Sequence, residues 1–139
     1  MPLIIQTAWY TRQQLQSQPD DLFAWGDNLA RVGGKNNPKS GQAFACRDEP
    51  NAVGIPTKRR PSMDDNAFFA DSDFDRVKPE IDSAFIRLAN HLRAGGTVYW
   101  PADGVGTRRA QLATRSPRIW AYLERCRERL FEVSDVVRR

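Results

Sequence analysis

Short apolar runs separated by turn-forming residues dominate the pattern of the chain. Four of these runs are rich in β-branched, aliphatic or aromatic residues: 3–9, 22–25, 51–57 and 97–100. Apolar runs of this length, bounded by turn residues, are typical of strands buried in a sheet. Pro56 lies in the third run. Because proline cannot donate a hydrogen bond to a neighbouring strand, we expect either that this run is an edge strand or that Pro56 lies at the end of its strand.

Two other stretches have helical periodicity. Apolar residues recur every three or four positions across 80–93 and across 116–131, which predicts two helices with one buried face each. Ser116 and Pro117 are typical of the first residues of a helix and mark the start of the second one. Shorter helices are expected at 11–18 and 42–47.

The order of these elements predicts an α/β fold. Strands and helices follow one another along the chain, which favours a mixed or mostly parallel sheet flanked by helices, in a single three-layer domain over residues 1–139. A long acidic loop is expected at about 59–79, where Phe68 and Phe69 would pack on the body or cover a ligand as part of a lid. The four tryptophans are expected in the core rather than as a base-stacking platform: Trp9, Trp25, Trp100 and Trp120.

Composition narrows the class of protein. The chain is 40% apolar and 27% charged, as in ordinary globular proteins. No apolar run reaches the roughly 18 residues that a membrane-spanning helix needs, and the first ten residues lack the features of a signal peptide, so we expect a cytoplasmic protein with no membrane partner. Cys46 and Cys126 are far apart and are expected as free thiols. The net charge of +4, with arginines crowded in the last quarter, permits attraction to phosphate-rich partners.

Glycine-rich polar turns follow two of the predicted strands, and another glycine-rich loop lies at 31–41. Ligands of open α/β sheets bind outside the carboxyl ends of the strands, where exposed backbone N–H groups can hold a phosphate. The candidate ligand-binding residues are Gly26, Asp27, Asn28, Gly33, Gly34, Gly41, Gln42, Asp103, Gly104, Val105, Gly106 and Thr107.

Charged residues near these turns could take part in a site, and for most of them a structural or surface role is also open. Asp27 and Asp103 could act as general bases across one crevice, or they could simply stabilise their own turns. Arg108 and Arg109 are well placed to neutralise a phosphate. The same role, or that of a solvated basic surface, is open to Lys35, Lys39, Arg47 and Lys58.

Other kinds of chemistry have little support. The chain has a single histidine, His91, on a helical stretch, for which a structural or surface role is expected, and no metal site or cofactor is predicted. The glycine loops match neither a Walker loop nor a dinucleotide fingerprint, and no serine or cysteine lies in the setting of a catalytic nucleophile.

Several motifs together resemble a family of small, largely uncharacterised bacteriophage proteins. They are FAWGDNLA from Phe23, GQA from Gly41, RDEPNAVGIPTK from Arg47, PSM from Pro61 and PADGVGT from Pro101. A remoter similarity to macro domains rests on Asn28, Gly33, Gly34, Gly41 and the turn 104–107, which match in order. That similarity implies an ADP-ribose ligand. The chain departs from the macro-domain pattern in an inserted KNNPKS and in the lack of a double asparagine in the early strand.

Two hypotheses of function follow. In the first, the chain is a phage-encoded protein that binds a small phosphorylated nucleotide derivative, such as ADP-ribose or an NAD-like molecule, with or without processing it. In the second, it is a host-takeover protein that contacts a host protein or nucleic acid through a basic helix surface carrying Arg118, Arg125 and Arg129.

Overall fold

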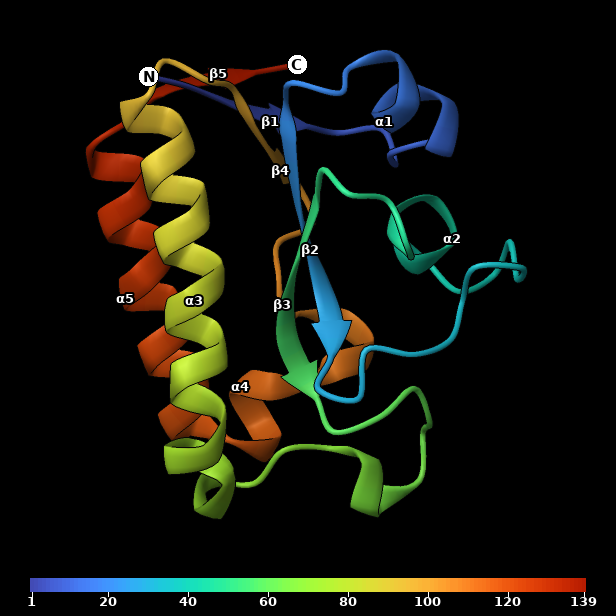
Figure 1. Cartoon of the computed structure of the whole chain (residues 1–139). Coiled ribbons are helices and arrows are strands. Elements are labelled where there is room, and N and C mark those ends of the chain that lie inside the picture. The colour runs from blue at the N-terminus through green and yellow to red at the C-terminus, as the bar shows by residue number, and fades with distance from the viewer.

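A five-stranded sheet forms the centre of the computed structural model, which describes all 139 residues (Figure 1). Its strands are β1 (Pro2–Gln6), β2 (Leu22–Asn28), β3 (Ala52–Lys58), β4 (Val98–Pro101) and β5 (Asp135–Arg138). They lie in the order β3-β2-β4-β1-β5, and every neighbouring pair is parallel. The fold is therefore α/β, as predicted, and the strand that contains Pro56 lies at an edge.

Helices cover both faces of the sheet, which gives three layers. The helices are α1 (Arg12–Ser17), α2 (Ala43–Cys46), α3 (Phe74–Arg93), α4 (Leu112–Arg115) and α5 (Pro117–Glu132). Figure 1 shows the long helices α3 and α5 on one face of the sheet, α1 and α2 on the other, and α4 toward its lower end. No helix combines the length and the apolar composition that crossing a membrane would require.

The two faces of the sheet are packed unequally. Strand residues alternate between them, so that Leu3 and Ile5 of β1 belong to the core under α3 and α5, whereas Ile4 faces α1 and α2. The first core contains 20 buried residues and the second only eight. The α1–α2 layer therefore contributes the smaller share of buried apolar area.

Two element boundaries and one whole strand differ from the predictions. Helix α3 begins at Phe74 rather than at residue 80 and carries Pro79 inside it. Proline there removes one helical hydrogen bond, but buried Val77 lies on the same face as the rest of the helix, and its packing extends the helix toward the N-terminus. Strand β2 continues to Asn28. Strand β5 was not predicted, because all four of its residues are exposed and it forms only by pairing with β1.

The placement of Trp9 in the core was also wrong. Strand β1 ends at Gln6, three residues before Trp9, and the tryptophan is 50% exposed. Trp25 and Trp100 are buried, as predicted, and Trp120 packs half-buried against the larger core.

The acidic segment after β3 packs on the body of the protein. It contains two short 3₁₀ turns and ends at Asp73, earlier than predicted, where α3 begins. Phe68 and Phe69 are both buried. Arg59 Nη2 donates to Asp73 Oδ2 at 2.7 Å, and the N–H of Ala70 donates to the same oxygen at 2.8 Å, which ties the two ends of the segment together.

Replacing Asp73 by asparagine should destabilise the protein by about 1 kcal/mol at neutral pH, because the ionised acceptor of these hydrogen bonds is lost. Burial alone would raise the pKa of Asp73, but the Ala70 N–H and the Arg59 guanidinium outweigh it and hold the pKa below its usual value. The stabilisation is therefore complete above the unfolded pKa of about 3.9 and is lost as the pH falls through the lower folded pKa. Urea unfolding should show a gap between wild type and Asp73→Asn that closes in acid. A gap that persisted at about pH 2 would contradict this role.

Candidate functional site

A cleft of about 650 Å³ opens at the carboxyl ends of β2, β3 and β4. Strands β2 and β4 pair only through Leu22–Val98 and Phe23–Tyr99, and beyond these residues they part. The cleft lies where they separate, because the last residues of all three strands, Asn28, Lys58 and Pro101, line it. This is the end of the sheet where the sequence predicted a ligand site.

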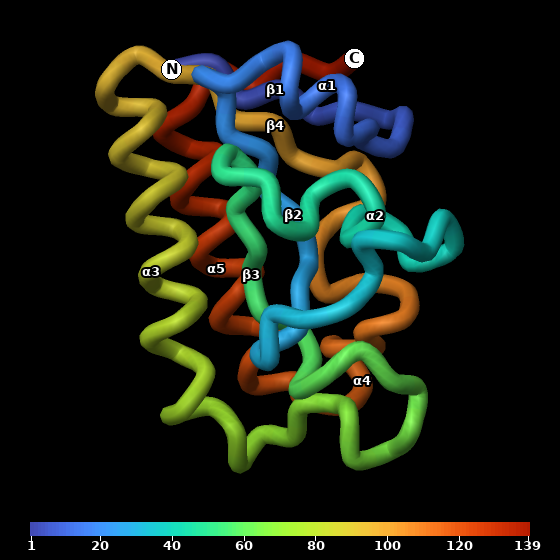
Figure 2. The backbone as a smooth tube through the Cα atoms, turned by 45° about the vertical axis from the view of Figure 1, so that its right-hand side comes forward, coloured from blue at the N-terminus to red at the C-terminus, as the bar shows by residue number.

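The cleft brings together eleven of the twelve candidate ligand-binding residues. The 31–41 loop forms one wall and the turn after β4 forms another, and Figure 2 shows these two segments close to each other. They are joined by a hydrogen bond from Arg109 Nη1 to the carbonyl oxygen of Lys39, at 3.0 Å. Val105 is the exception, since its side chain is buried in the larger core.

Asp27 lies beneath the cleft in a buried ion pair with Arg47. Arg47 Nη2 donates to Asp27 Oδ1 at 2.6 Å and Nη1 donates to Oδ2 at 3.0 Å. The same carboxylate accepts from the backbone N–H of Asn28 at 2.7 Å and from Arg31 Nη1 at 3.3 Å. Four donors occupy its oxygens, which leaves Asp27 little capacity to act as a general base and gives it the role of holding Arg47.

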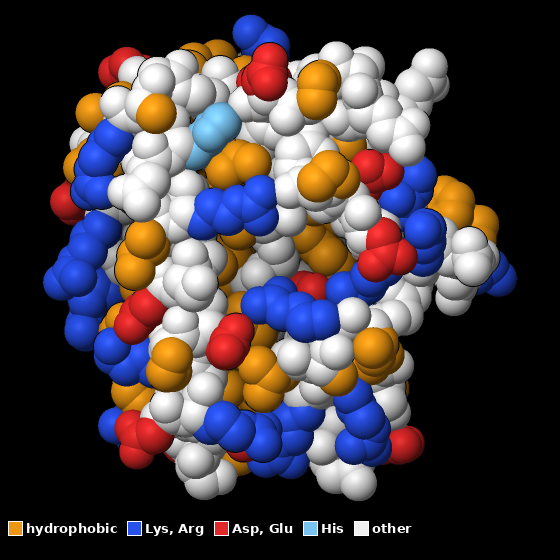
Figure 3. All heavy atoms as spheres, viewed as in Figure 1, with side chains coloured by type: hydrophobic (Ala, Val, Ile, Leu, Met, Phe, Trp, Pro, Cys, Tyr) orange, Lys and Arg blue, Asp and Glu red, His pale blue; other side chains and the backbone are white.

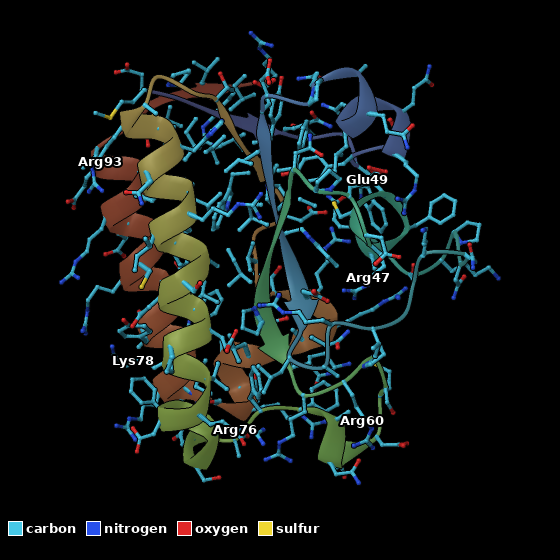
Figure 4. The ribbon with its side chains drawn as sticks, viewed as in Figure 1. Arg47, Glu49, Arg60, Arg76, Lys78 and Arg93 are labelled. Carbon is cyan, nitrogen blue, oxygen red and sulfur yellow. The ribbon has the colours of Figure 1, made fainter.

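Arg47 in turn holds the glycine loop. The residue follows α2, and Figure 4 shows it on that side of the sheet. Its Nε donates to the carbonyl oxygen of Gly33 and its Nη2 to that of Val32, both at 3.0 Å. The guanidinium also lies over the ring of Trp25, 5.0 Å from the centroid. One buried cation therefore fixes the 31–34 backbone to β2.

Asn28, the other polar candidate at the end of β2, is also engaged within the protein, as is Thr57 of the neighbouring strand β3. The Nδ2 of Asn28 donates to the carbonyl oxygen of Val32 at 2.9 Å, and its Oδ1 accepts from the Val32 N–H at 3.4 Å. The hydroxyl of Thr57 donates to the carbonyl oxygen of Asp27 at 3.0 Å. These side chains shape the cleft rather than pointing free groups into it.

The turn after β4 has unused backbone donors. Gly104 and Gly106 both have positive φ, at 88° and 83°. None of the backbone N–H groups of Val105, Gly106 and Thr107 donates to an acceptor in the protein, although Val105 and Gly106 are buried residues. A buried N–H without a partner costs free energy comparable to a lost hydrogen bond. Such groups are suited to an external acceptor.

Asp103 is the second candidate base, and it too is paired. Arg108 Nη2 lies 3.2 Å from Asp103 Oδ1, and both side chains are substantially exposed. The hydroxyl of Thr107 donates to the carbonyl oxygen of Asp103 at 2.7 Å, which closes the turn. Asp27 and Asp103 line the same cleft, but each one faces its own arginine.

Three cations of the cleft have no carboxylate within ion-pair distance: Lys39, Lys58 and Arg109. Lys58 Nζ donates to the carbonyl oxygen of Ser62 and lies 4.5 Å from the ring centroid of Phe68. Burial, and then the positive charges of Arg109 and Arg115, lower the pKa of Lys58. The repulsion of Lys58 by Arg109 and Arg115 indicates a positive electrostatic potential on this wall of the cleft.

A smaller hollow of about 320 Å³ lies on the other side of the Asp27–Arg47 pair, at the β3 edge beside α3. Figure 3 looks onto this hollow near the centre of the view. Acidic and basic side chains alternate around it, among them Arg31, Glu80 and Arg87. Lys35, a candidate phosphate ligand, lines neither hollow and pairs instead with Asp48 at 3.2 Å.

The chain was also compared with known proteins. A model described as a family of unknown function, DUF7831, matches residues 5–126. The chain belongs to the DUF7831 family. Comparison with curated proteins found no match, and comparison with solved structures found none either.

The DUF7831 match contains the whole cleft, whose lining runs from Trp9 to Ala110. Of the elements of the fold, it leaves out β5 and the ends of β1 and α5. Every residue that lines the cleft therefore lies within the part of the chain that the family model matches.

Neither cysteine lines the DUF7831 cleft. Both cysteines are free thiols, and burial raises the pKa of Cys46 far above the usual range, which keeps that thiol protonated. No three histidine, cysteine, aspartate or glutamate side chains are grouped as ligands for a metal ion. What the cleft offers chemically is backbone N–H groups and unpaired cations, together with the exposed ring of Trp9, which sequence reasoning missed.

Proposed function

We propose that the chain binds a small phosphorylated ligand of the nucleotide class, such as ADP-ribose or an NAD-like molecule, in the cleft at the carboxyl ends of β2, β3 and β4. The phosphates would lie against the backbone N–H groups of Gly106 and Thr107 and the side chains of Lys58 and Arg109. One observation carries the proposal: unpaired cations and unused backbone donors line the same cleft.

Electrostatics supports this ligand class. Lys39, Lys58 and Arg109 have no carboxylate partner, and the two carboxylates that line the cleft, Asp27 and Asp103, are both neutralised by arginines. A phosphate would relieve the repulsion among the cations and satisfy the turn through charge-assisted hydrogen bonds. The cleft volume of about 650 Å³ also lies within the usual range of about 300–1,000 Å³ for small-molecule sites.

Binding, rather than turnover, is the centre of the proposal. Asp27 and Asp103 are the two candidate bases, and ion pairs occupy both. The similarity of the loop order to macro domains favours the same ligand class. In a bacteriophage setting, such a protein would capture or process a nucleotide-derived signal of the host.

Isothermal titration with ADP-ribose, NAD, ATP and pyrophosphate tests this proposal. Lys58→Gln and Arg109→Gln should each weaken binding of the best ligand about tenfold or more, since each removes a charged donor to phosphate. Arg125→Gln on the outer face of α5 is the matched control and should leave the affinity unchanged. If wild type bound none of these ligands, or if the control weakened binding as much as the cleft variants, the proposal would be wrong.

A second candidate function rests on the exposed arginines of α5. Arg125 and Arg129 are exposed, one turn apart, and form no ion pair, whereas Arg118 is engaged over the ring of Phe74 at 3.9 Å. Figure 3 shows Lys and Arg side chains along the outer side of the helical layer. Figure 4 labels Lys78 and Arg93 on α3, of which Lys78 is paired with Asp82 at 2.8 Å. A surface of this kind suits phosphates of a nucleic acid.

Duplex DNA binding measured at several salt concentrations separates the two candidates. Affinity that falls steeply with salt and is lost in Arg125→Glu/Arg129→Glu would favour the nucleic-acid surface. Lack of DNA affinity in wild type would remove this candidate and leave the cleft proposal untouched.

A further inference from the structure

Trp9 is exposed in a way that the other tryptophans are not. Its exposed fraction is 50%, against 3% for Trp25 and 2% for Trp100, and it lines the cleft that contains the unpaired cations. A tryptophan side chain that is half exposed loses part of the stabilisation that burial of its apolar surface would give. A planar ligand in the cleft could cover this exposed face of the ring.

The residues that follow Trp9 fix the backbone on its C-terminal side. The N–H of Tyr10 donates to Gln42 Oε1 at 3.2 Å, and the Tyr10 hydroxyl donates to the carbonyl oxygen of Ala24 at 3.0 Å. Thr11 then caps α1 by accepting from the N–H of Gln14 at 3.0 Å. The hydrogen-bonded turn between β1 and α1 thus positions Trp9.

The far edge of the indole ring rests on the glycine loop. A Cβ atom added to Gly41 would meet Cη2 and Cζ3 of Trp9 at 3.7 Å, which is ordinary van der Waals contact. Gly41 has a φ of 69°, so a glycine suits its backbone. The hydrogen bonds of Tyr10 fix the backbone beside the ring, and the far edge of the ring lies next to Gly41, so the exposed face of the ring is available to a ligand.

Trp9 and Arg109 approach the same short segment of chain, residues 39–41. Gly41 supports Trp9, and two residues earlier the carbonyl oxygen of Lys39 accepts from Arg109. Two residues span at most about 7 Å even when fully extended. A sugar that bridges a base and a phosphate has a comparable length, so one nucleotide is long enough to reach from the Trp9 side of this segment toward Arg109.

We propose that Trp9 is the stacking platform for the base of the ligand, and that the cleft consequently selects nucleotides over phosphorylated sugars without a base. This inference rests on the proposed function, because it assigns one further part of the same ligand. An aromatic ring adds a basis for ligand selection that the cations alone do not supply. Stacking on the ring tolerates different bases, but a ligand without a base cannot stack.

Titration of two ligand sets against two substitutions tests this inference. Trp9→Ala should weaken binding of AMP and ADP-ribose about tenfold while leaving ribose 5-phosphate and pyrophosphate within about twofold of wild type. Trp9→Phe, which keeps an aromatic face, should recover most of the nucleotide affinity. Phe44→Ala is the matched control, because Phe44 is an exposed aromatic residue, 42% accessible, that does not line the cleft.

Tryptophan emission gives an independent readout. Nucleotide should quench the emission of wild type and of Phe44→Ala, and this quenching should be largely lost in Trp9→Phe. Equal weakening of nucleotides and base-free phosphates by Trp9→Ala, or no weakening at all, would overturn the inference and leave the proposed function standing. Absence of binding by every phosphorylated ligand in wild type would overturn both.

Discussion

Replacing Asp27 by alanine should lower the free energy of unfolding by about 3–5 kcal/mol, the cost typical of removing one member of a buried ion pair. The side chains of Asp27 and Arg47 are only 3% and 9% exposed. Without the carboxylate, the Arg47 charge stays buried, with only carbonyl oxygens as partners, and the Asn28 N–H loses its acceptor. Urea unfolding of the two proteins, followed by far-UV circular dichroism, measures the difference.

A partly exposed ion pair supplies the control, with side chains 25% exposed for Glu124 and 28% for Arg127. Glu124 and Arg127 are bonded at 2.8 Å on the surface of α5, where pairs contribute about 0–1 kcal/mol, so Glu124→Ala should change stability little. The loss of stability in the double variant Asp27→Ala/Arg47→Ala should be smaller than the sum of the losses in the two single variants. The reason is that the double variant leaves no unpaired buried charge. An Asp27→Ala effect no larger than that of Glu124→Ala would show that the pair is not buried as described.

Valine at Gly106 should destabilise the fold by about 2–4 kcal/mol, whereas valine at Gly104 should act mainly on the cleft. Both positions have positive φ, which a β-branched residue strongly disfavours. The added Cβ at Gly106 would lie 2.9 Å from Cδ2 of the buried Leu112, but at Gly104 its nearest contact is the side chain of half-buried Thr107, at 3.1 Å.

Thermal unfolding and ligand titration separate the two glycines. Gly104→Val should stay folded and lose most of its affinity for the phosphorylated ligand, since its side chain enters the cleft beside the N–H groups of the turn. Gly106→Val should show a lowered melting temperature in the absence of any ligand. Equal melting temperatures for the two variants would contradict the packing of the turn against α4.

The sequence was sufficient for the main outline of the fold and the location of the cleft. Apolar periodicity predicted four of the five strands and both long helices, because these elements bury one or two faces continuously. The position of the cleft was expected from a rule of parallel sheets: the polar glycine turns after β2 and β4 lie at the same, carboxyl end of the sheet. Eleven candidate residues lie there together as a result.

The partners of the polar residues could not be predicted in the same way. Arg47 is 20 residues from Asp27 along the chain, and only the packing of α2 on β2 brings them together. Strand β5 has no buried residue to produce a pattern, and Trp9 lies in an apolar run that continues past the end of its strand. In each of these cases the role of the residue or strand depends on tertiary contacts, which the spacing of residues along the chain does not reveal.

The unequal packing of the two sheet faces has a consequence for motion. Helices α1 and α2 are six and four residues long, too short to be stable alone, and they rest on the core of eight buried residues. Their amides should exchange with deuterium well before those of α3, through a local opening that leaves the rest of the sheet intact. Trp9 and the glycine loop belong to this layer, so a bound ligand should slow its exchange selectively. The wall that recognises the ligand is then also the part of the molecule that the ligand most stabilises.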